Sequence, residues 1–485
     1  MFRLALVFLF ISNLLPAQDF NINYYPLRNY KIDSLGLEKI ALGFDTISCF
    51  KRVKGKDKKK YCIKAINDIK EGLIFSNKYD QLMKADTLTA YFQKRIDQVK
   101  AANRDLLNYP FTLFILRTGE PNASNLGSGV IYLNLELISR LNPEEVTYVL
   151  CHEMAHDVKK HVVLGIAKSA ELYIGKEYKK SEEKIDKQKY NTLKQRKELE
   201  TRIYAQYTKH SRALELEADS LGLVFYMNAG GTLATAVHTE IKLDSVDQPY
   251  FKNSIDIKKH FDFPEYPFDT LLLQNQTTSN IGNRVVFSIP DSLKTHPDCS
   301  TRAKVLSRIK IASSGASASK IADYDVQKRS VFEILEMHIA DEKYDEALFY
   351  ALELLEQYPE NLFLKASVCN CLYEIHNAQV KHTFSKSVDF PGKDYPSNFN
   401  MLLTFLQNSN SRIILKTFNG YFDKNLKNIV NDPYVGYVSS LKAVLEHPEK
   451  KENAGDEYIR TYGSNYYSEL LKKKFPKKNE DKKKK

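Results

Sequence analysis

Residues 150–157 read LCHEMAHD, and this stretch constrains the chain most because it places a glutamate between two histidines that are four positions apart. An α-helix advances about 100° per residue, so His152 and His156 would leave the same face, one turn apart. Both imidazoles could then bind one metal ion, with Glu153 beside them as a candidate base. The pattern predicts metal-dependent hydrolysis, provided that the segment is helical.

The residues before this motif contain the signals that start a helix. Asn142 can cap it, Pro143 suits the first helical position, and Glu145 can complete a capping box. No Pro or Gly follows before Gly165. We therefore expect a helix of about six turns that contains both histidines.

Two histidines do not complete a catalytic zinc site, which uses three protein ligands and keeps one position open. The stretch SRALELEADSLGL at residues 211–223 places Glu215 and Asp219 four apart in a helix-forming sequence. Glu215 could bind the same ion, and Asp219 could accept a hydrogen bond from the far nitrogen of a ligand histidine. Two crossing helices would then form one site.

Three segments together resemble a known family. They are residues 122–161, which contain the first motif, residues 211–223, and the sequence HPDCSTR at residues 296–302. In order and residue type they resemble the HtpX-type, BepA-type and prenyl-protease-type zinc metalloendopeptidases of peptidase family M48, over roughly residues 85–310. Many members of this family span the membrane, so the chain resembles a soluble, exported branch.

The resemblance also implies roles for individual residues. One zinc ion per chain would be bound by His152, His156 and Glu215, with Asp219 in support. Glu153 would act as general base on a zinc-activated water that attacks a peptide bond. The resemblance places His296 near the site and leaves open whether it stabilises the transition state or acts as an extra ligand that blocks the water.

The run GVIYLNL at residues 129–135 lies between a Gly-rich and Asn-rich turn and the metal helix. Mainly from the resemblance, we predict that it is an edge strand at the rim of the cleft. Its backbone would bind an extended substrate through four residues: Gly129, Val130, Ile131 and Tyr132. The alternative is an ordinary core strand.

Residues 1–18, MFRLALVFLFISNLLPAQ, contain one early Arg and an apolar run that is short for a bilayer span. They predict a cleaved signal peptide, and hence a periplasmic or secreted protein. The remaining sequence has no long uncharged apolar stretch, so we expect no transmembrane segment in the mature chain.

Within the N-terminal segment 19–84, Cys49 and Cys62 could close a disulfide hairpin, which suits an oxidising compartment.

The net charge of +11 comes from two short segments. Residues 51–60 carry 7 basic and 1 acidic side chains, and residues 472–485 carry 9 basic and 2 acidic ones. The rest of the chain is therefore nearly neutral, and it contains no nucleic-acid recognition motif. We expect no nucleic-acid partner, although the basic loop and the tail could make peripheral contact with an anionic membrane.

The predicted fold class is mainly α with a small β-sheet, in which a zincin-type metallopeptidase domain precedes an α-helical repeat domain. Apolar spacing over residues 342–361 is typical of a tetratricopeptide repeat, which often binds a protein partner in a groove. The predicted order is a peptidase domain at 85–311, a linker at 312–322, repeats at 323–395, further helices at 396–471 and a disordered Lys-rich tail at 472–485.

Two further segments could lie near the site. The charged run at residues 176–200 predicts a solvated helix, with a lid over the cleft as the alternative. The Pro-punctuated run at residues 263–276 predicts a loop near the site.

Two functions from different classes remain open. The first is an exported zinc metalloendopeptidase that acts on polypeptides such as misfolded or envelope proteins. The second is a binding or assembly factor that works through its repeats and has a latched or vestigial zinc site. The complete set of His152, Glu153, His156, Glu215 and Asp219 favours the first, because a vestigial site would be expected to have lost at least one of them.

Overall fold

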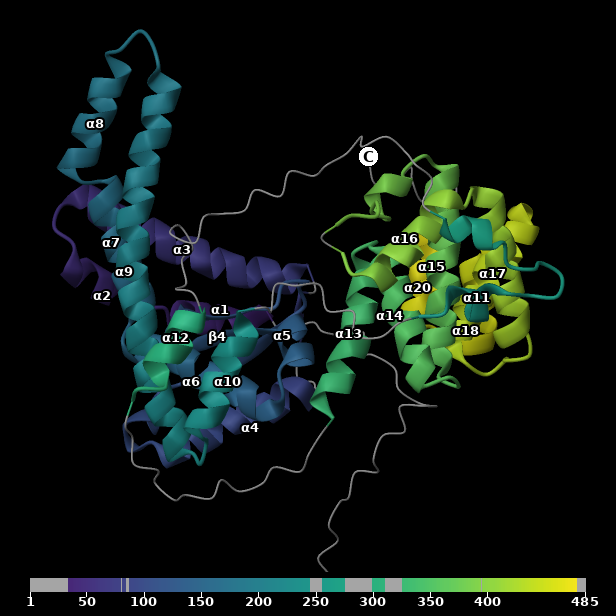
Figure 1. Ribbon diagram of the computed structural model, residues 1–485, viewed down its shortest axis with the longest axis horizontal. Coiled ribbons are helices and arrows are strands. Elements are labelled where there is room, and N and C mark those ends of the chain that lie inside the picture. The colour runs from purple at the N-terminus through teal and green to yellow at the C-terminus, as the bar shows by residue number, and fades with distance from the viewer. Residues whose placement is uncertain are drawn as a thin grey trace, which may run out of the picture. The chain divides into compact units, whose positions relative to one another are not determined.

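The structure is a computed structural model that describes residues 34–79, 81–83, 87–244, 255–274, 299–309, 325–393 and 395–477 (Figure 1). The described residues divide into two units. The N-terminal unit is formed by residues 34–244, 299–309 and 325–337, and the C-terminal unit by residues 255–274 and 338–477. Both are built mainly from helices, and the N-terminal unit contains one small sheet, so the predicted fold class is confirmed.

The helices of the N-terminal unit surround this sheet. They are α1 (Ser34–Leu42), α2 (Thr46–Arg52), α3 (Lys56–Lys78), α4 (Thr87–Ala102), η1 (Arg104–Leu106), α5 (Leu135–Arg140), α6 (Pro143–Val158), α7 (His161–Tyr173), α8 (Lys176–Asp186), α9 (Thr192–Asn228), α10 (Leu233–Leu243), α12 (Cys299–Leu306) and most of α13 (Val326–Ala340). The basic segment at residues 51–60 is not a loop, because α2 ends and α3 begins within it.

The sheet consists of β1 (Leu82–Met83), β2 (Thr112–Leu116), β3 (Ala123–Gly127) and β4 (Val130–Asn134) in the order β1-β2-β4-β3. Strand β4 runs parallel to β2 and antiparallel to β3, and every one of its five residues is buried.

The prediction of an edge strand at residues 129–135 is therefore wrong. The backbone of Val130, Ile131 and Tyr132 is already paired with β2 and β3, and Gly129 is in the turn between β3 and β4, where a Cβ would lie 2.1 Å from the Pro110 carbonyl oxygen. Among the described residues, β3 pairs with β4 alone and so forms that edge of the sheet.

Helix α6 begins as predicted but ends sooner. The Asn142 side chain accepts hydrogen bonds from the backbone of Glu144 and Glu145, and the Asn142 N–H donates one to the Glu145 carboxylate at 2.8 Å. The helix stops at Val158, because Lys160 adopts a left-handed conformation with φ 58°, and α7 starts at the next residue. Two helices thus replace the single helix expected as far as Gly165.

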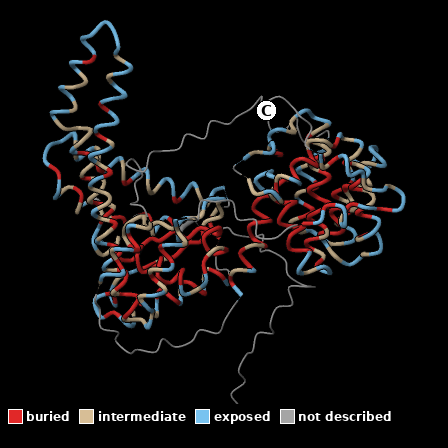
Figure 2. The backbone as a smooth tube through the Cα atoms, in the orientation of Figure 1, coloured by how far each residue is buried: buried red, intermediate tan, exposed pale blue. Residues whose placement is uncertain are grey.

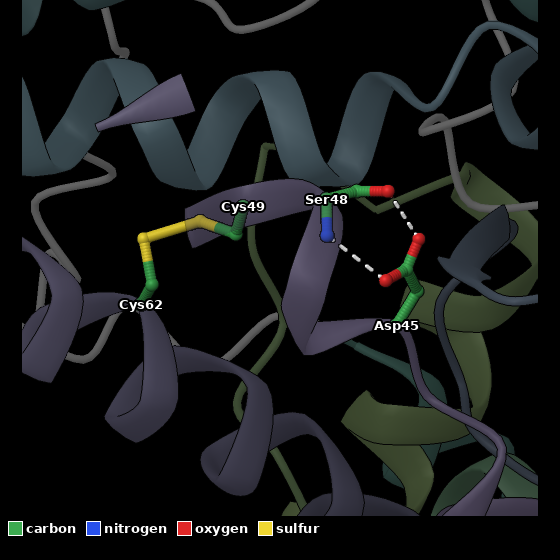
Figure 3. Close-up of a disulfide and its surroundings, with 4 residues drawn as sticks. All are labelled: Asp45, Ser48, Cys49 and Cys62. Atoms are coloured by element: carbon green, nitrogen blue, oxygen red, sulfur yellow. Dashed lines mark hydrogen bonds between the residues drawn. A yellow bond between two sulfur atoms is a disulfide. The ribbon is translucent and has the colours of Figure 1, made fainter. Parts of the chain in front are cut away.

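The N-terminal helices share one hydrophobic core with the sheet and α7. This core contains Leu37, Ile66, Phe114, Val130 and Ala167, which come from α1, α3, β2, β4 and α7 respectively. Cys49 and Cys62 belong to the same core and form a disulfide between α2 and α3 (Figure 3).

The charged run after α7 forms a helical hairpin of α8 and the first half of α9, which extends beyond the rest of this unit (Figure 1). Ile185, near the end of α8, packs with Leu199 and Ile203 of α9, and Leu172 and Tyr173 of α7 pack against this cluster. Most of the remaining surface of the hairpin is exposed (Figure 2). The hairpin is thus a solvated projection, as the first interpretation of residues 176–200 expected.

The C-terminal unit is a set of packed helices: α11 (Ile257–Phe261), η2 (Thr270–Leu273), α14 (Tyr344–Gln357), α15 (Leu362–Val380), η4 (Phe384–Lys386), α16 (Ser397–Asn408), α17 (Ser411–Asn425), α18 (Pro433–Glu446), η5 (Pro448–Asn453), α19 (Ala454–Tyr462) and α20 (Tyr466–Lys474). Helices α14 and α15 pack against each other. The assignment of tetratricopeptide repeats stays a prediction.

Residues 263–274 belong to the C-terminal unit, whereas the metal motif belongs to the N-terminal unit, and a location of this run near the site stays a prediction. Phe261 stacks on Phe405 with ring centroids 5.5 Å apart, and the Asn408 amide donates to the Leu272 carbonyl at 2.9 Å. Apolar packing rather than proximity in sequence decides where this segment lies.

Several predicted segments lie wholly or partly outside the described residues. They are the signal peptide at 1–18, the linker at 312–322 and the tail from residue 478. Residues 472–474 belong to α20, so the predicted tail begins too early.

No helix in the described part of the chain is both long enough and apolar enough to cross a bilayer.

Helices α6 and α9 approach each other closely at Gly222, where a Cβ would lie 2.8 Å from the Cα of His152 and 2.9 Å from its backbone nitrogen. We expect Gly222→Ala to push the helices apart and to lower the free energy of unfolding by about 1–3 kcal/mol, measured by urea denaturation.

The control is Gly72→Ala, at an exposed position of α3 where a Cβ meets nothing within 4 Å. This change should stabilise by about 0.4–1 kcal/mol. Equal effects of the two substitutions would contradict the steric explanation.

Candidate metal centre

The crossing of α6 and α9 brings together the three predicted ligands. Donor atoms of His152, His156 and Glu215 all lie within 4.8 Å of one another. The two Nε2 atoms of the histidines are 2.9 Å apart, and the Glu215 carboxylate oxygens lie 3.4 Å from His152 Nε2 and 3.6 Å from His156 Nε2. Residues about sixty positions apart in the chain thus converge on one point.

The chemistry of this group fits zinc. Two imidazole nitrogens and one carboxylate are a donor set that zinc accepts in hydrolytic enzymes, and three protein ligands leave one coordination position open. Glu153, on α6 next to His152, is only 7% exposed. Its role as the base stays a prediction.

Asp219 occupies the supporting position that the sequence predicted for it. Its Oδ1 lies 2.9 Å from Nδ1 of His152 and its side chain is 1% exposed. An acceptor at Nδ1 fixes the tautomer that presents Nε2 to a metal ion. Burial by itself would lower the pKa of His152, but its hydrogen bonds with Asp219 and Glu215 outweigh burial and raise that pKa to about 10.

Arg302, on α12, completes the surroundings of Asp219. Its Nε donates to Asp219 Oδ2 at 2.8 Å, and its Nη2 also contacts the same carboxylate. Burial alone would raise the pKa of Asp219, but the hydrogen bonds from Arg302 and His152 hold it below its usual value. Asp219 therefore stays ionised although it is buried.

Two more buried side chains extend this network. Glu240, on α10, lies 3.0 Å from Arg302 Nη2 and accepts a hydrogen bond of 3.0 Å from the Tyr148 hydroxyl. Burial raises the pKa of the Glu240 carboxyl. Sequence reasoning gave neither Arg302 nor Glu240 a role, although Arg302 ends the quoted HPDCSTR segment. The sequence could have pointed to Arg302 only indirectly, because a buried Asp219 carboxylate requires a cationic partner.

His161 contacts the second ligand from the start of α7. Its Nδ1 lies 2.9 Å from Nδ1 of His156, and its Nε2 lies 3.3 Å from the Glu217 carboxylate. Burial and the neighbouring His156 lower the pKa of His161 to about 4. The neutral ring of His161 therefore holds His156 from the side opposite the ion.

Two other groups of predicted site residues lie elsewhere. His296 is outside the described residues, so its role stays a prediction. Gly129, Val130, Ile131 and Tyr132 are not members of the metal group, although the Gly129 N–H donates to Asp157 near the end of α6 at 2.9 Å.

Comparison with protein families gave a match over part of the chain. Residues 86–310 match the model described as Peptidase family M48, and this range includes the three ligands, Glu153, Asp219 and Arg302. A search of curated proteins found no match.

The hydrogen bond between Asp219 and His152 gives a quantitative prediction. Asp219→Asn should weaken zinc binding about 10- to 100-fold, because the ligand histidine loses the carboxylate that orients it. Competition against a chromogenic chelator at neutral pH measures the affinity.

Glu198→Gln is the matched control, since it neutralises a carboxylate on the same helix at an exposed position of the projecting hairpin. Circular dichroism verifies that both variants fold. Equal zinc affinities for folded Asp219→Asn and Glu198→Gln would contradict the orienting role.

Proposed function

We propose that this chain, which carries a metalloprotease domain of peptidase family M48 over residues 86–310, is a zinc-dependent endopeptidase that hydrolyses peptide bonds of other proteins. The observation that carries the proposal is the group of His152, His156 and Glu215 on two crossing helices. The resemblance of residues 122–161 and 211–223 to HtpX-type and BepA-type enzymes supports it further.

The residues of the chain divide the chemical work among them. A zinc ion held by this group would supply Lewis acidity and lower the pKa of water towards neutrality. Glu153 would take the proton from that water and deliver it to the leaving amine. Asp219 orients His152 through Nδ1, and Arg302 keeps Asp219 ionised and in place.

Substrate backbone binding is assigned in this proposal to β3. This strand forms the sheet edge that packs against α6, and the Asn125 amide on β3 reaches the Asp157 carboxylate at 3.5 Å. An extended polypeptide paired with β3 would therefore lie along the metal helix. Main-chain hydrogen bonds depend little on the amino-acid sequence of the substrate, and this suits a protease that acts on unfolded proteins.

Export is also part of the proposal. The apolar segment at residues 1–18 supports it, and so does the Cys49–Cys62 disulfide, since such bonds persist in oxidising compartments. In the periplasm or outside the cell, the substrates would be misfolded or envelope proteins. The helices of the C-terminal unit, in this proposal tetratricopeptide-like, would bind a protein partner or deliver a substrate.

Replacing the base separates chemistry from metal binding. Glu153→Gln should retain zinc by elemental analysis yet cleave unfolded casein about 100- to 10,000-fold more slowly, because the proton acceptor is lost. His152→Ala should lose both zinc and activity.

Incubating the wild type with 1,10-phenanthroline should stop cleavage, and added zinc should restore it. If neither the wild type nor His296→Ala shows chelator-sensitive cleavage, the endopeptidase proposal fails and the alternative of a repeat-based binding factor gains support.

A further inference from the structure

A cavity of about 300 Å³ opens directly beside the metal group. Its lining includes His156 and Glu215 of the metal group, several residues of α7 and α9, and Tyr61 and Ala65 of α3. We call this cavity the metal-side pocket. Its size is at the lower end of the range for sites that bind small ligands, and it is large enough for one bulky side chain.

Resting on the proposed function, we propose that the metal-side pocket binds the side chain of a substrate residue next to the scissile bond, and that Tyr61 determines its size limit. Tyr61 lies before the segment that matches the peptidase family, so this specificity-determining residue comes from an N-terminal helix outside it.

The position of the pocket fixes which part of a substrate can enter it. A peptide bond that is hydrolysed must lie at the ion held by His156 and Glu215, and these two ligands are also part of the pocket lining. Only the side chains that flank the scissile bond are close enough to reach from the ion into this space. The pocket therefore acts on the residue beside the cleaved bond.

The lining determines the class of side chain. Val162, Ile166 and Leu214 supply aliphatic surface, and Tyr61 and Tyr207 supply aromatic rings. Among the described residues that line the pocket there is neither Lys nor Arg. An acidic side chain would lose hydration without gaining a Lys or Arg partner, whereas a large aromatic one would bury its ring against Tyr61 and Tyr207.

Gly165, Tyr207 and Tyr61 all line the pocket. A Cβ placed on Gly165 of α7 would lie 3.4 Å from the Tyr207 hydroxyl on α9. An added methyl group at Gly165 would narrow this space, and removal of the Tyr61 ring would widen it.

The part of α3 that carries Tyr61 is linked to α2 by a disulfide. The next residue, Cys62, is bonded to Cys49 on α2, and both are fully buried (Figure 3). Asp45 caps α2 by accepting the Ser48 N–H at 2.9 Å, and Lys160, between α6 and α7, lies 3.1 Å from the Ser48 hydroxyl. The disulfide thus connects α3, which carries Tyr61, to α2, and α2 in turn contacts the turn between α6 and α7.

The experiment uses the full chain and begins with casein cleavage sites mapped by mass spectrometry. Fluorogenic peptides built around one cleaved bond then carry Phe or Trp at each flanking position in turn. At one of the two positions, Tyr61→Ala should raise the Trp-to-Phe ratio of kcat/KM about tenfold, and Gly165→Ala should lower it by a similar factor. General damage to the enzyme cannot produce opposite changes.

Three controls accompany these variants. Ile63→Ala, at an exposed site on the same helix, and Tyr61→Phe, which keeps the ring, should both retain the wild-type ratio. The double variant Cys49→Ser/Cys62→Ser should raise the Trp-to-Phe ratio, as Tyr61→Ala does, because α3 with Tyr61 is then no longer bonded to α2 and can move away from the pocket.

The possible failures can be told apart. If casein is cleaved but neither Tyr61→Ala nor Gly165→Ala changes the ratio, the pocket assignment is overturned and the proposed function stands. If the wild type cleaves no casein, both are overturned.

Discussion

The backbone contact between α6 and α9 at Gly222 is the constraint on which the metal centre depends. Without a side chain there, α9 lies directly against His152. Asp219 and Glu215 precede Gly222 by three and seven residues on the same helix face, so one close approach aligns both carboxylates with the histidines of α6. A larger spacing between the helices would leave the four side chains on the right faces but out of reach of one another.

This arrangement buries several charged side chains, which is unfavourable unless the charges are paired. Asp219, Arg302 and Glu240 are each nearly inaccessible, and Arg302 contacts both carboxylates. A buried ion pair of this kind contributes little net stability, but removal of one partner is costly because the other charge stays unpaired. The network therefore fixes one geometry around His152 more than it strengthens the fold.

The parts of the site that local periodicity encodes could be predicted from the sequence, and the parts that depend on distant contacts could not. Spacing and capping residues identified α6, His152, His156 and Glu215, because helix geometry follows from a few neighbouring residues. The end of α6 at Val158 was missed, since Lys160 adopts its left-handed conformation without Gly or Pro. Strand β4 was placed at an edge, although its unbroken apolar run is typical of a strand buried on both faces. Arg302 was missed because its partner is 83 residues away.

The helix that carries Glu215 also has a mechanical consequence. Helix α9 is continuous over 37 residues, about 55 Å in length, and its first half forms part of the projecting hairpin while its second half holds Glu215 and Asp219. A single unbroken rod turns as one body, so a load applied at its free end acts as a torque on the end that carries Glu215. A force on the hairpin would therefore tend to rotate α9 about its contact with α6.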